Sequence, residues 1–243
     1  MLQSINELLA IFYSDISSMN IMRKYRFGNK KYGKRESREQ IYRALQKISR
    51  RMAQAAGMKI KVIGAENLPK NGPVVYIANH KGLFDTVTLV STINDPCIAI
   101  VKREVERMPI ISRWVRALGC IYLDRDDIRQ SLEAILEGIK ELKEGQSIFI
   151  FPEGTRSKTD EIGKFKEGSF KLALKANVPI VPIALLNTEK VFEVNKKIVP
   201  QTVYMNVGKP IDTKNLTAEE KKHLPKMVEN TVKELLEQAK NNN

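Results

Sequence analysis

The chain has 243 residues, 42% of them hydrophobic and 28% charged, which is typical of a globular domain and excludes a wholly disordered chain. Its net charge of +13 indicates an anionic partner: nucleic acid, a phosphorylated substrate or an acidic lipid surface. Two cysteines and two histidines give neither a disulfide framework nor a zinc-binding pattern, so we expect no metal and no cofactor.

The first quarter of the chain carries most of the excess charge, with 12 lysines and arginines against 4 aspartates and glutamates in residues 1–57. Residues 2–22 predict an amphipathic helix that Asp15 interrupts, and residues 36–56 predict a second one. Between them, residues 23–35 hold seven basic side chains. The apolar face of the first helix consists of Ile5, Leu8, Leu9, Phe12, Ile16 and Met19. We predict that this N-terminal region associates with a membrane.

Two other interpretations of this region stay open. The helices could pack on the main domain with their charges in water, as many amphipathic helices do. The basic residues are also interleaved with Tyr25, Phe27 and Tyr32, whose rings could stack on bases. No recognised nucleic-acid-binding motif accompanies them, so we expect an anionic membrane surface and no nucleic acid as partner. With no apolar stretch of spanning length and no evident cleavable signal, we expect a reduced, cytoplasmic protein.

From residue 58 on, short apolar runs alternate with longer helical patterns, which is typical of an α/β domain. The predicted strands are residues 59–63, 74–78, 97–101, 121–123, 147–151, 180–185 and 203–207. One predicted helix starts at Asp126 or Asp127 and stops at Gly145. Its inward face consists of Ile128, Leu132, Ile135, Ile139 and Leu142. A last helix begins with the capping box Thr217 to Glu220. We predict one domain over residues 58–243.

Two polar loops directly follow apolar strands in this domain. The first, NHKGLFDT (79–86), contains His80 and Asp85, and the second is FPEGTRS (151–157). Ligands of open α/β sheets bind beyond the carboxyl ends of the strands. A carboxylate that accepts from Nδ1–H of a histidine leaves Nε2 free to remove a proton, so His80 and Asp85 are a candidate base and its orienting partner. An ordinary histidine at the end of a core strand is the alternative.

The second loop has the groups that a phosphate monoester needs. Glu153, Gly154, Thr155 and Arg156 are consecutive, and together they offer a bidentate guanidinium, a hydroxyl and backbone N–H groups. We therefore predict an anion-binding site there.

Four blocks of sequence occur in the order NHKGLFD, IYLDR, FPEGTRS and VPIVPIAL, within residues 79–185. Their order and spacing resemble the glycerolipid acyltransferase family, which includes the 1-acyl-sn-glycerol-3-phosphate acyltransferases. The form FPEGTRS resembles the branch that acylates lysophosphatidate. This resemblance implies an α/β fold with a mixed, largely parallel sheet flanked by helices, preceded here by the two-helix appendage.

The resemblance also implies roles for individual residues. His80 would deprotonate the acceptor hydroxyl and Asp85 would orient it. Glu153, Gly154 and Arg156 would hold the phosphate and glycerol of the acceptor, with Arg125 as a further ligand. Lys102 would stabilise the thioester oxyanion or the phosphate. The family's first block usually reads NHxSxxD, and Gly82 here replaces the serine, which puts the local support of the loop or the choice of acceptor in question.

The implied activity is transfer of a fatty acyl group from acyl carrier protein or coenzyme A to the free sn-2 hydroxyl of 1-acylglycerol 3-phosphate (lysophosphatidate), forming phosphatidate in phospholipid biosynthesis. Such an enzyme would be peripheral, on the cytoplasmic face of the cell membrane. Glycerol 3-phosphate or a lysophospholipid as acceptor, and a non-catalytic lipid-binding protein, are the alternatives.

Individual residues have alternatives of their own. Lys102 could be a surface lysine, and Arg125 could pair with one of the aspartates beside it. Cys97 or Cys120 as a nucleophile is the rival mechanism, although both look like small core residues.

Overall fold

A computed structural model describes residues 4, 7, 10, 11, 16–25, 31–70, 72–157, 159 and 161–242. Seven strands form one sheet in the order β1-β7-β6-β2-β5-β3-β4. Their bounds are β1 Lys59–Ile63, β2 Val75–Ala78, β3 Cys97–Lys102, β4 Ile121–Leu123, β5 Ser147–Ile150, β6 Ile180–Leu186 and β7 Thr202–Val207. Each lies within a residue or two of a predicted strand.

The sheet is mixed and mostly parallel. The strands β6, β2, β5, β3 and β4 run in one direction. β7 is antiparallel to β6, and β1 is parallel to β7. The predicted fold class is therefore confirmed. Because five neighbouring strands share one direction, the loops after β2, β3, β4, β5 and β6 all leave the sheet at the same edge.

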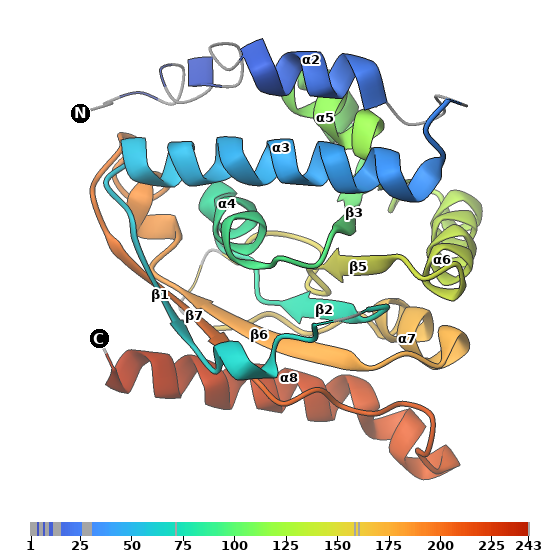
Figure 1. Ribbon diagram of the computed structural model, residues 1–243. Coiled ribbons are helices and arrows are strands. Elements are labelled where there is room, and N and C mark those ends of the chain that lie inside the picture. The colour runs from blue at the N-terminus through green and yellow to red at the C-terminus, as the bar shows by residue number, and fades with distance from the viewer. Residues whose placement is uncertain are drawn as a thin grey trace.

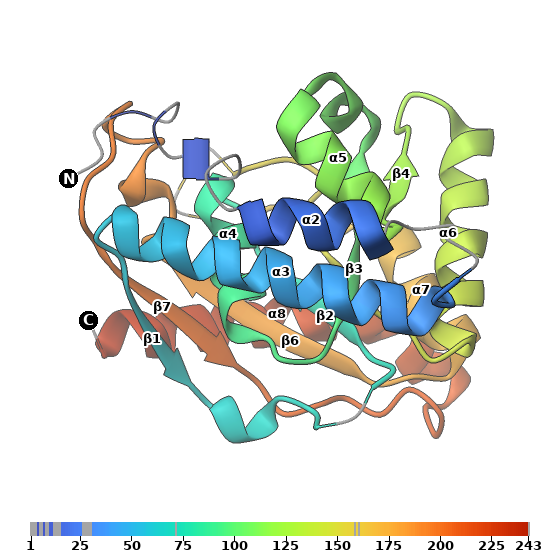
Figure 2. The ribbon, with the colours of Figure 1, turned by 45° about the horizontal axis from the view of Figure 1, so that its top comes forward.

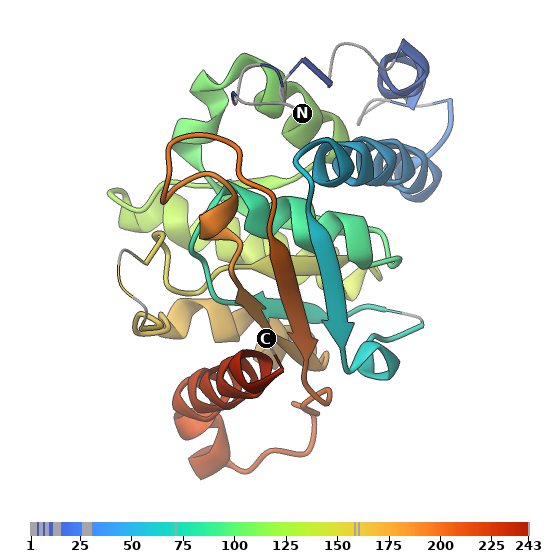
Figure 3. The same ribbon diagram turned by 90° about the vertical axis from the view of Figure 1, so that its left-hand side faces the viewer.

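Helices cover both faces of this sheet. The α-helices are α2 Ile16–Tyr25, α3 Lys34–Ala55, α4 Leu83–Thr92, α5 Pro109–Leu118, α6 Ile128–Lys143, α7 Phe170–Ala176 and α8 Ala218–Asn241. The 3₁₀ turns are η1 Ala65–Asn67, η2 Arg103–Arg107, η3 Glu167–Ser169 and η4 Glu189–Val191. Figure 1 shows α3 and α4 above the sheet and α8 below it, and Figure 3 shows the same layers from the side.

The N-terminal helices lie against the α/β domain. Figure 2 shows α2 beside α3, with the chain running in opposite directions along the two. On α3, Ile41, Tyr42 and Ile48 are fully buried in the same core as the sheet. The positions Ile5, Leu8, Leu9 and Phe12 of the predicted first helix lie outside the described residues. The membrane-associating region over residues 1–57 stays a prediction.

A buried ion pair also ties α3 to the domain. Arg38 Nη1 lies 2.5 Å from Glu141 Oε2 on α6, and both residues are buried.

No helix within the described ranges is both long and apolar enough to cross a bilayer.

The inward face predicted for α6 is partly wrong. Asp127 caps this helix, with its carboxylate accepting from the backbone N–H groups of Arg129 and Gln130. However, Ile128 is 87% exposed and Leu132 is 54% exposed. The helix instead turns the small residues Ala134 and Gly138, together with Ile135 and Leu142, toward the core. Because Gly138 has no side chain, α6 approaches α7 closely: a Cβ placed at Gly138 would lie 2.6 Å from Leu172 Cδ2.

Candidate active site

His80 follows β2 at the edge of the sheet where the parallel strands end. Its Nδ1 lies 2.6 Å from Asp85 Oδ2, and its side chain is 19% exposed. The imidazole ring stacks on Phe151, which follows β5, with ring centroids 4.1 Å apart and planes inclined by 10°. The ring is therefore fixed by a hydrogen bond on one side and by packing on its face.

Asp85 lies in the first turn of α4 and is fully buried. Its Oδ2 accepts the backbone N–H groups of Lys81 (2.7 Å) and Gly82 (2.8 Å) as well as His80. Its Oδ1 accepts the hydroxyl of Thr188. Four donors thus hold this carboxylate, and the positive end of α4 stabilises its charge.

Three carboxylates take up the backbone donors of the His80 loop, one after another. The N–H of His80 donates to Glu153 Oε1 at 2.7 Å. Lys81 and Gly82 donate to Asp85, and Leu83 donates to Glu193 Oε1 at 2.7 Å. No backbone N–H of residues 80–83 is left to bind an external anion.

The loop after β5 is attached to the His80 loop by its backbone. Besides the bond from His80, the Glu153 carboxylate accepts the N–H of Gly163 at 2.8 Å through Oε2. Ser157 in turn donates its N–H to the carbonyl of His80 at 2.8 Å. Burial raises the pKa of Glu153, and the two N–H bonds oppose that rise. In the described structure Glu153 therefore holds the two loops together through hydrogen bonds to their backbones. Its contact with substrate stays a prediction.

Two cations converge on Gly154. This glycine has φ of 78°, and a Cβ placed there would lie 3.1 Å from Lys166 Nζ and 3.2 Å from Arg125 Cζ. Among the described residues, none forms an ion pair with Arg125 or Lys166. Partial burial lowers the pKa of Arg125. No described aspartate beside Arg125 lies within ion-pair distance of it, although the charges of Glu104 and Asp126 oppose the lowering of its pKa. The two cations make this loop a candidate anion site.

The other predicted ligands lie farther toward solvent. Arg156 is half exposed, with Nη1 3.5 Å from Glu193 Oε1. Thr155 is exposed. Lys102, at the end of β3, is exposed and lies 3.4 Å from Glu104 Oε1. The structure thus brings His80, Asp85 and Glu153 into direct contact and Arg125 beside Gly154, while Lys102 has no described contact with them.

The chemistry available at this edge is proton transfer beside a loop on which two cations converge. A histidine with its Nδ1 bonded to a buried carboxylate can take a proton at Nε2. The cysteines do not offer a nucleophile, because burial raises the pKa of Cys97 well above its ordinary value and that of Cys120 to about 11. Within the described residues, no three side chains among His, Cys, Asp and Glu cluster as metal ligands would.

Comparison with known proteins decides the family. The family model described as Acyltransferase matches residues 59–186, which include both loops of the site. The chain belongs to the acyltransferase family. The resemblance seen in the four sequence blocks is thereby confirmed.

Relatives of this acyltransferase come from distant organisms. It is 35% identical to the 1-acyl-sn-glycerol-3-phosphate acyltransferase of Borreliella burgdorferi over 188 residues, 76% of this chain and 74% of the relative. It is 32% identical to the enzyme of the same name from Saccharomyces cerevisiae, over 66% of this chain and 54% of the relative. The crystal structure of the 1-acyl-sn-glycerophosphate acyltransferase from Thermotoga maritima superimposes with a TM-score of 0.76 at 26% identity, covering 96% and 95% of the two chains.

Four residues of this acyltransferase site were not predicted from the sequence. Phe151 stacks on His80, Thr188 donates to Asp85, Lys166 approaches Gly154, and Glu193 accepts from Leu83. Phe151 and Lys166 lie within or shortly after FPEGTRS, so their proximity to that motif was an available signal. No sequence signal marks Thr188 or Glu193, since both come from the connection after β6.

Proposed function

We propose that this acyltransferase transfers a fatty acyl group from an acyl thioester, carried by acyl carrier protein or coenzyme A, to the free sn-2 hydroxyl of 1-acylglycerol 3-phosphate, forming phosphatidate. The observation that carries the proposal is the 2.6 Å contact between His80 Nδ1 and buried Asp85, beside a loop where cations converge. The names of the relatives support lysophosphatidate as the acceptor.

The transfer takes two proton movements, both through His80. Nε2 removes the proton of the acceptor hydroxyl while its oxygen attacks the thioester carbonyl carbon, and the Asp85 carboxylate stabilises the imidazolium that forms. The tetrahedral intermediate then expels the thiolate, which takes the proton back from Nε2. The products are the new ester and a free thiol, and no acyl-enzyme forms.

The acceptor phosphate binds near Gly154 in this proposal. Arg125 and Lys166 supply two positive charges there, and Arg156 supplies a planar guanidinium from the same loop as Gly154. Support comes from the lack of ion-pair partners of Arg125 and Lys166 among the described residues. Lys102, at the same edge of the sheet, remains a candidate for stabilising the thioester oxyanion.

The acceptor carries one acyl chain and resides in a bilayer, so we infer that the enzyme is peripheral on the cytoplasmic face of the cell membrane. The N-terminal helices and the basic stretch 23–35 would hold it there. The same positive charge would attract an acidic carrier protein.

The test is release of thiol from acyl-carrier-protein and acyl-coenzyme A thioesters, with lysophosphatidate in vesicles as acceptor. His80→Ala should lower kcat at least about a hundredfold, as loss of a general base does. The chain offers a matched control in its only other histidine, His223, which is exposed on α8. His223→Ala should keep full activity.

Each result has a definite meaning. Equal activity of His80→Ala and His223→Ala would show that His80 is a structural histidine. Activity of the wild type only with glycerol 3-phosphate or a lysophospholipid would replace the acceptor but keep the chemistry. No thiol release with any acceptor, by folded and vesicle-bound protein, would leave a non-catalytic lipid-binding protein.

A further inference from the structure

Glu193 joins the two loops of the site although it belongs to neither. It lies in the connection between β6 and β7, beyond the last residue that the family model matches. Its Oε1 accepts the N–H of Leu83, the first residue of α4, at 2.7 Å, and lies 3.5 Å from Arg156 Nη1. One carboxylate oxygen therefore connects the helix that carries Asp85 to the loop that carries the candidate phosphate ligands.

Glu193 occupies the space that a side chain at residue 82 would enter. Gly82 has φ of −156°, an extended conformation that any residue adopts, so its backbone does not require glycine. A Cβ at this position would lie 2.7 Å from Glu193 Oε2 and 2.9 Å from its Cδ. Gly82 and Glu193 thus lie in close contact, and a side chain at position 82 requires the Glu193 carboxylate to shift.

Stability alone does not account for this carboxylate. Its Oε2 is buried and has no hydrogen-bond partner among the described residues. The side chain is 19% exposed, and its unpartnered buried oxygen carries a desolvation cost that an apolar side chain of similar volume would avoid. What the carboxylate adds is a negative charge beside Arg156 and an acceptor for Leu83.

We propose that Glu193 is a positioning residue of the acceptor site, which holds the His80 loop through Leu83 and turns the Arg156 guanidinium toward that loop. The proposal rests on the acyl transfer proposed above. Glu193 would restrain Arg156 through Nη1 and leave its other N–H groups for the acceptor phosphate, so less rotamer freedom would be lost when the phosphate binds.

Two substitutions separate the two contacts. Glu193→Gln keeps an oxygen that can accept from Leu83 but removes the charge, so the acceptor KM should rise about threefold to fivefold, the limit for a half-exposed ion pair, with kcat within about twofold. Glu193→Ala also removes the Leu83 bond, and kcat should fall about tenfold. The KM of the thioester donor should not change in either. Glu234→Gln, an exposed carboxylate on α8, is the control.

Arg156 provides the check that the KM effect runs through this pair. If it does, Glu193→Gln should add nothing to the acceptor KM of Arg156→Gln. An acceptor KM that falls in Glu193→Gln would show that Glu193 competes with the phosphate, and an unchanged KM would show that the pair is idle. Either result overturns the positioning role.

The fit between Gly82 and Glu193 is tested without substrate. Gly82→Ala should lower the Tm by about 3 °C in the wild-type background, as overpacking does, and by less than about 1 °C in the Glu193→Ala background.

If the wild type acylates no acceptor, the proposed function fails, and hydrogen exchange of the Leu83 amide then tests the positioning role. Faster exchange in Glu193→Ala than in Glu193→Gln supports the role, and equal exchange in both overturns it.

Discussion

Replacing Asp85 with asparagine tests whether a carboxylate is needed behind His80, because the change removes the charge and leaves the shape. Three of the four donors on Asp85 meet Oδ2: the Nδ1 of His80 and the backbone N–H groups of Lys81 and Gly82. The fourth, the hydroxyl of Thr188, meets Oδ1. An asparagine with its carbonyl oxygen at the Oδ2 position can keep the first three.

The magnitudes follow from this division. The amide NH₂ then faces Thr188, whose hydroxyl can rotate to accept instead of donate, so the cost in stability should be only about 1–2 kcal/mol. The imidazolium, however, loses its negative partner in a buried site, and kcat should fall by about 10²–10⁴. The expected result is a folded protein with little activity.

The assay is thiol release at saturating acceptor, with the Tm recorded on the same samples. Thr188→Val removes the hydroxyl without touching the charge, so it should lower stability by about 1–3 kcal/mol but lower kcat far less than the asparagine variant. If Asp85→Asn kept more than about half of the wild-type kcat, the Asp85 carboxylate would have no part in orienting or charging the base.

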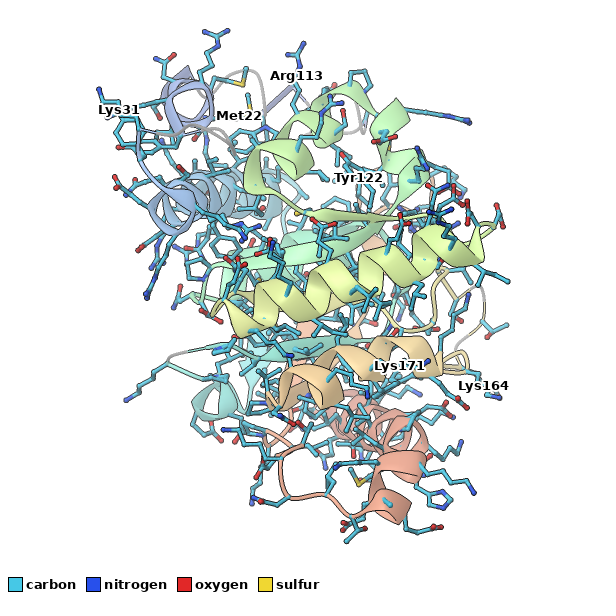
Figure 4. All side chains as sticks on the ribbon, turned by 90° about the vertical axis from the view of Figure 1, so that its right-hand side faces the viewer. Met22, Lys31, Arg113, Tyr122, Lys164 and Lys171 are labelled. Carbon is cyan, nitrogen blue, oxygen red and sulfur yellow. The ribbon has the colours of Figure 1, made fainter. Side chains whose placement is uncertain are left out.

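Lys166→Gln should raise the KM of lysophosphatidate about tenfold, because Lys166 approaches Gly154. Lys164→Gln, an equally exposed lysine of the same loop that is labelled in Figure 4, should leave this KM unchanged, and equal effects of the two substitutions would exclude a phosphate site at Gly154. Lys31 and Arg35 are both exposed, and neutralising them should weaken binding to anionic vesicles about thirtyfold at low salt. The reason is that each basic residue near the membrane surface contributes about 1 kcal/mol. Unchanged sedimentation of the protein with the vesicles would refute the membrane contact. Two lysine partners and a backbone N–H lower the pKa of Glu229 to about 2, against the effect of burial. The Glu229 carboxylate therefore stabilises the fold above pH 4.5, and this contribution is lost as the pH falls toward 2. The free energy of unfolding of Glu229→Gln should therefore lie about 1–2 kcal/mol below that of the wild type at pH 7, because water screens the ion pairs. The two values should meet near pH 2.

The sheet was predictable because its signals are local. Each strand of the parallel core is a short apolar run between turns, and a strand buried on both faces must read that way. The capping box of α8 is equally local, and Thr217 caps this helix as predicted by accepting the N–H of Glu220. The face of α6 was predicted less well. Bulky apolar residues such as Ile128 were assigned to the inward face, but the contact between α6 and α7 requires a residue without a side chain at Gly138. Apolar periodicity does not indicate how closely two helices pack.

The site was predictable only where its parts are adjacent in the sequence. His80 and Asp85 are five residues apart, so the short loop between β2 and α4 is enough to bring them together. Glu153 was predicted as a ligand of the acceptor, while the structure shows both its oxygens bonded to backbone N–H groups. Glu193 reaches Leu83 across 110 positions, and such a contact is set by how the β6–β7 connection packs, which no local pattern encodes.

The carboxylates around His80 also decide where an anion can bind. A helix N-terminus after a strand commonly binds phosphate through its free N–H groups. Here Asp85 and Glu193 occupy those groups at the start of α4, so a phosphate would meet two negative charges and no donor. The cations instead converge on Gly154, on the loop after the neighbouring strand β5. In the proposed mechanism, this separation would place negative charge beside the histidine, where it would favour an imidazolium, and positive charge one strand away, where it would hold the acceptor phosphate.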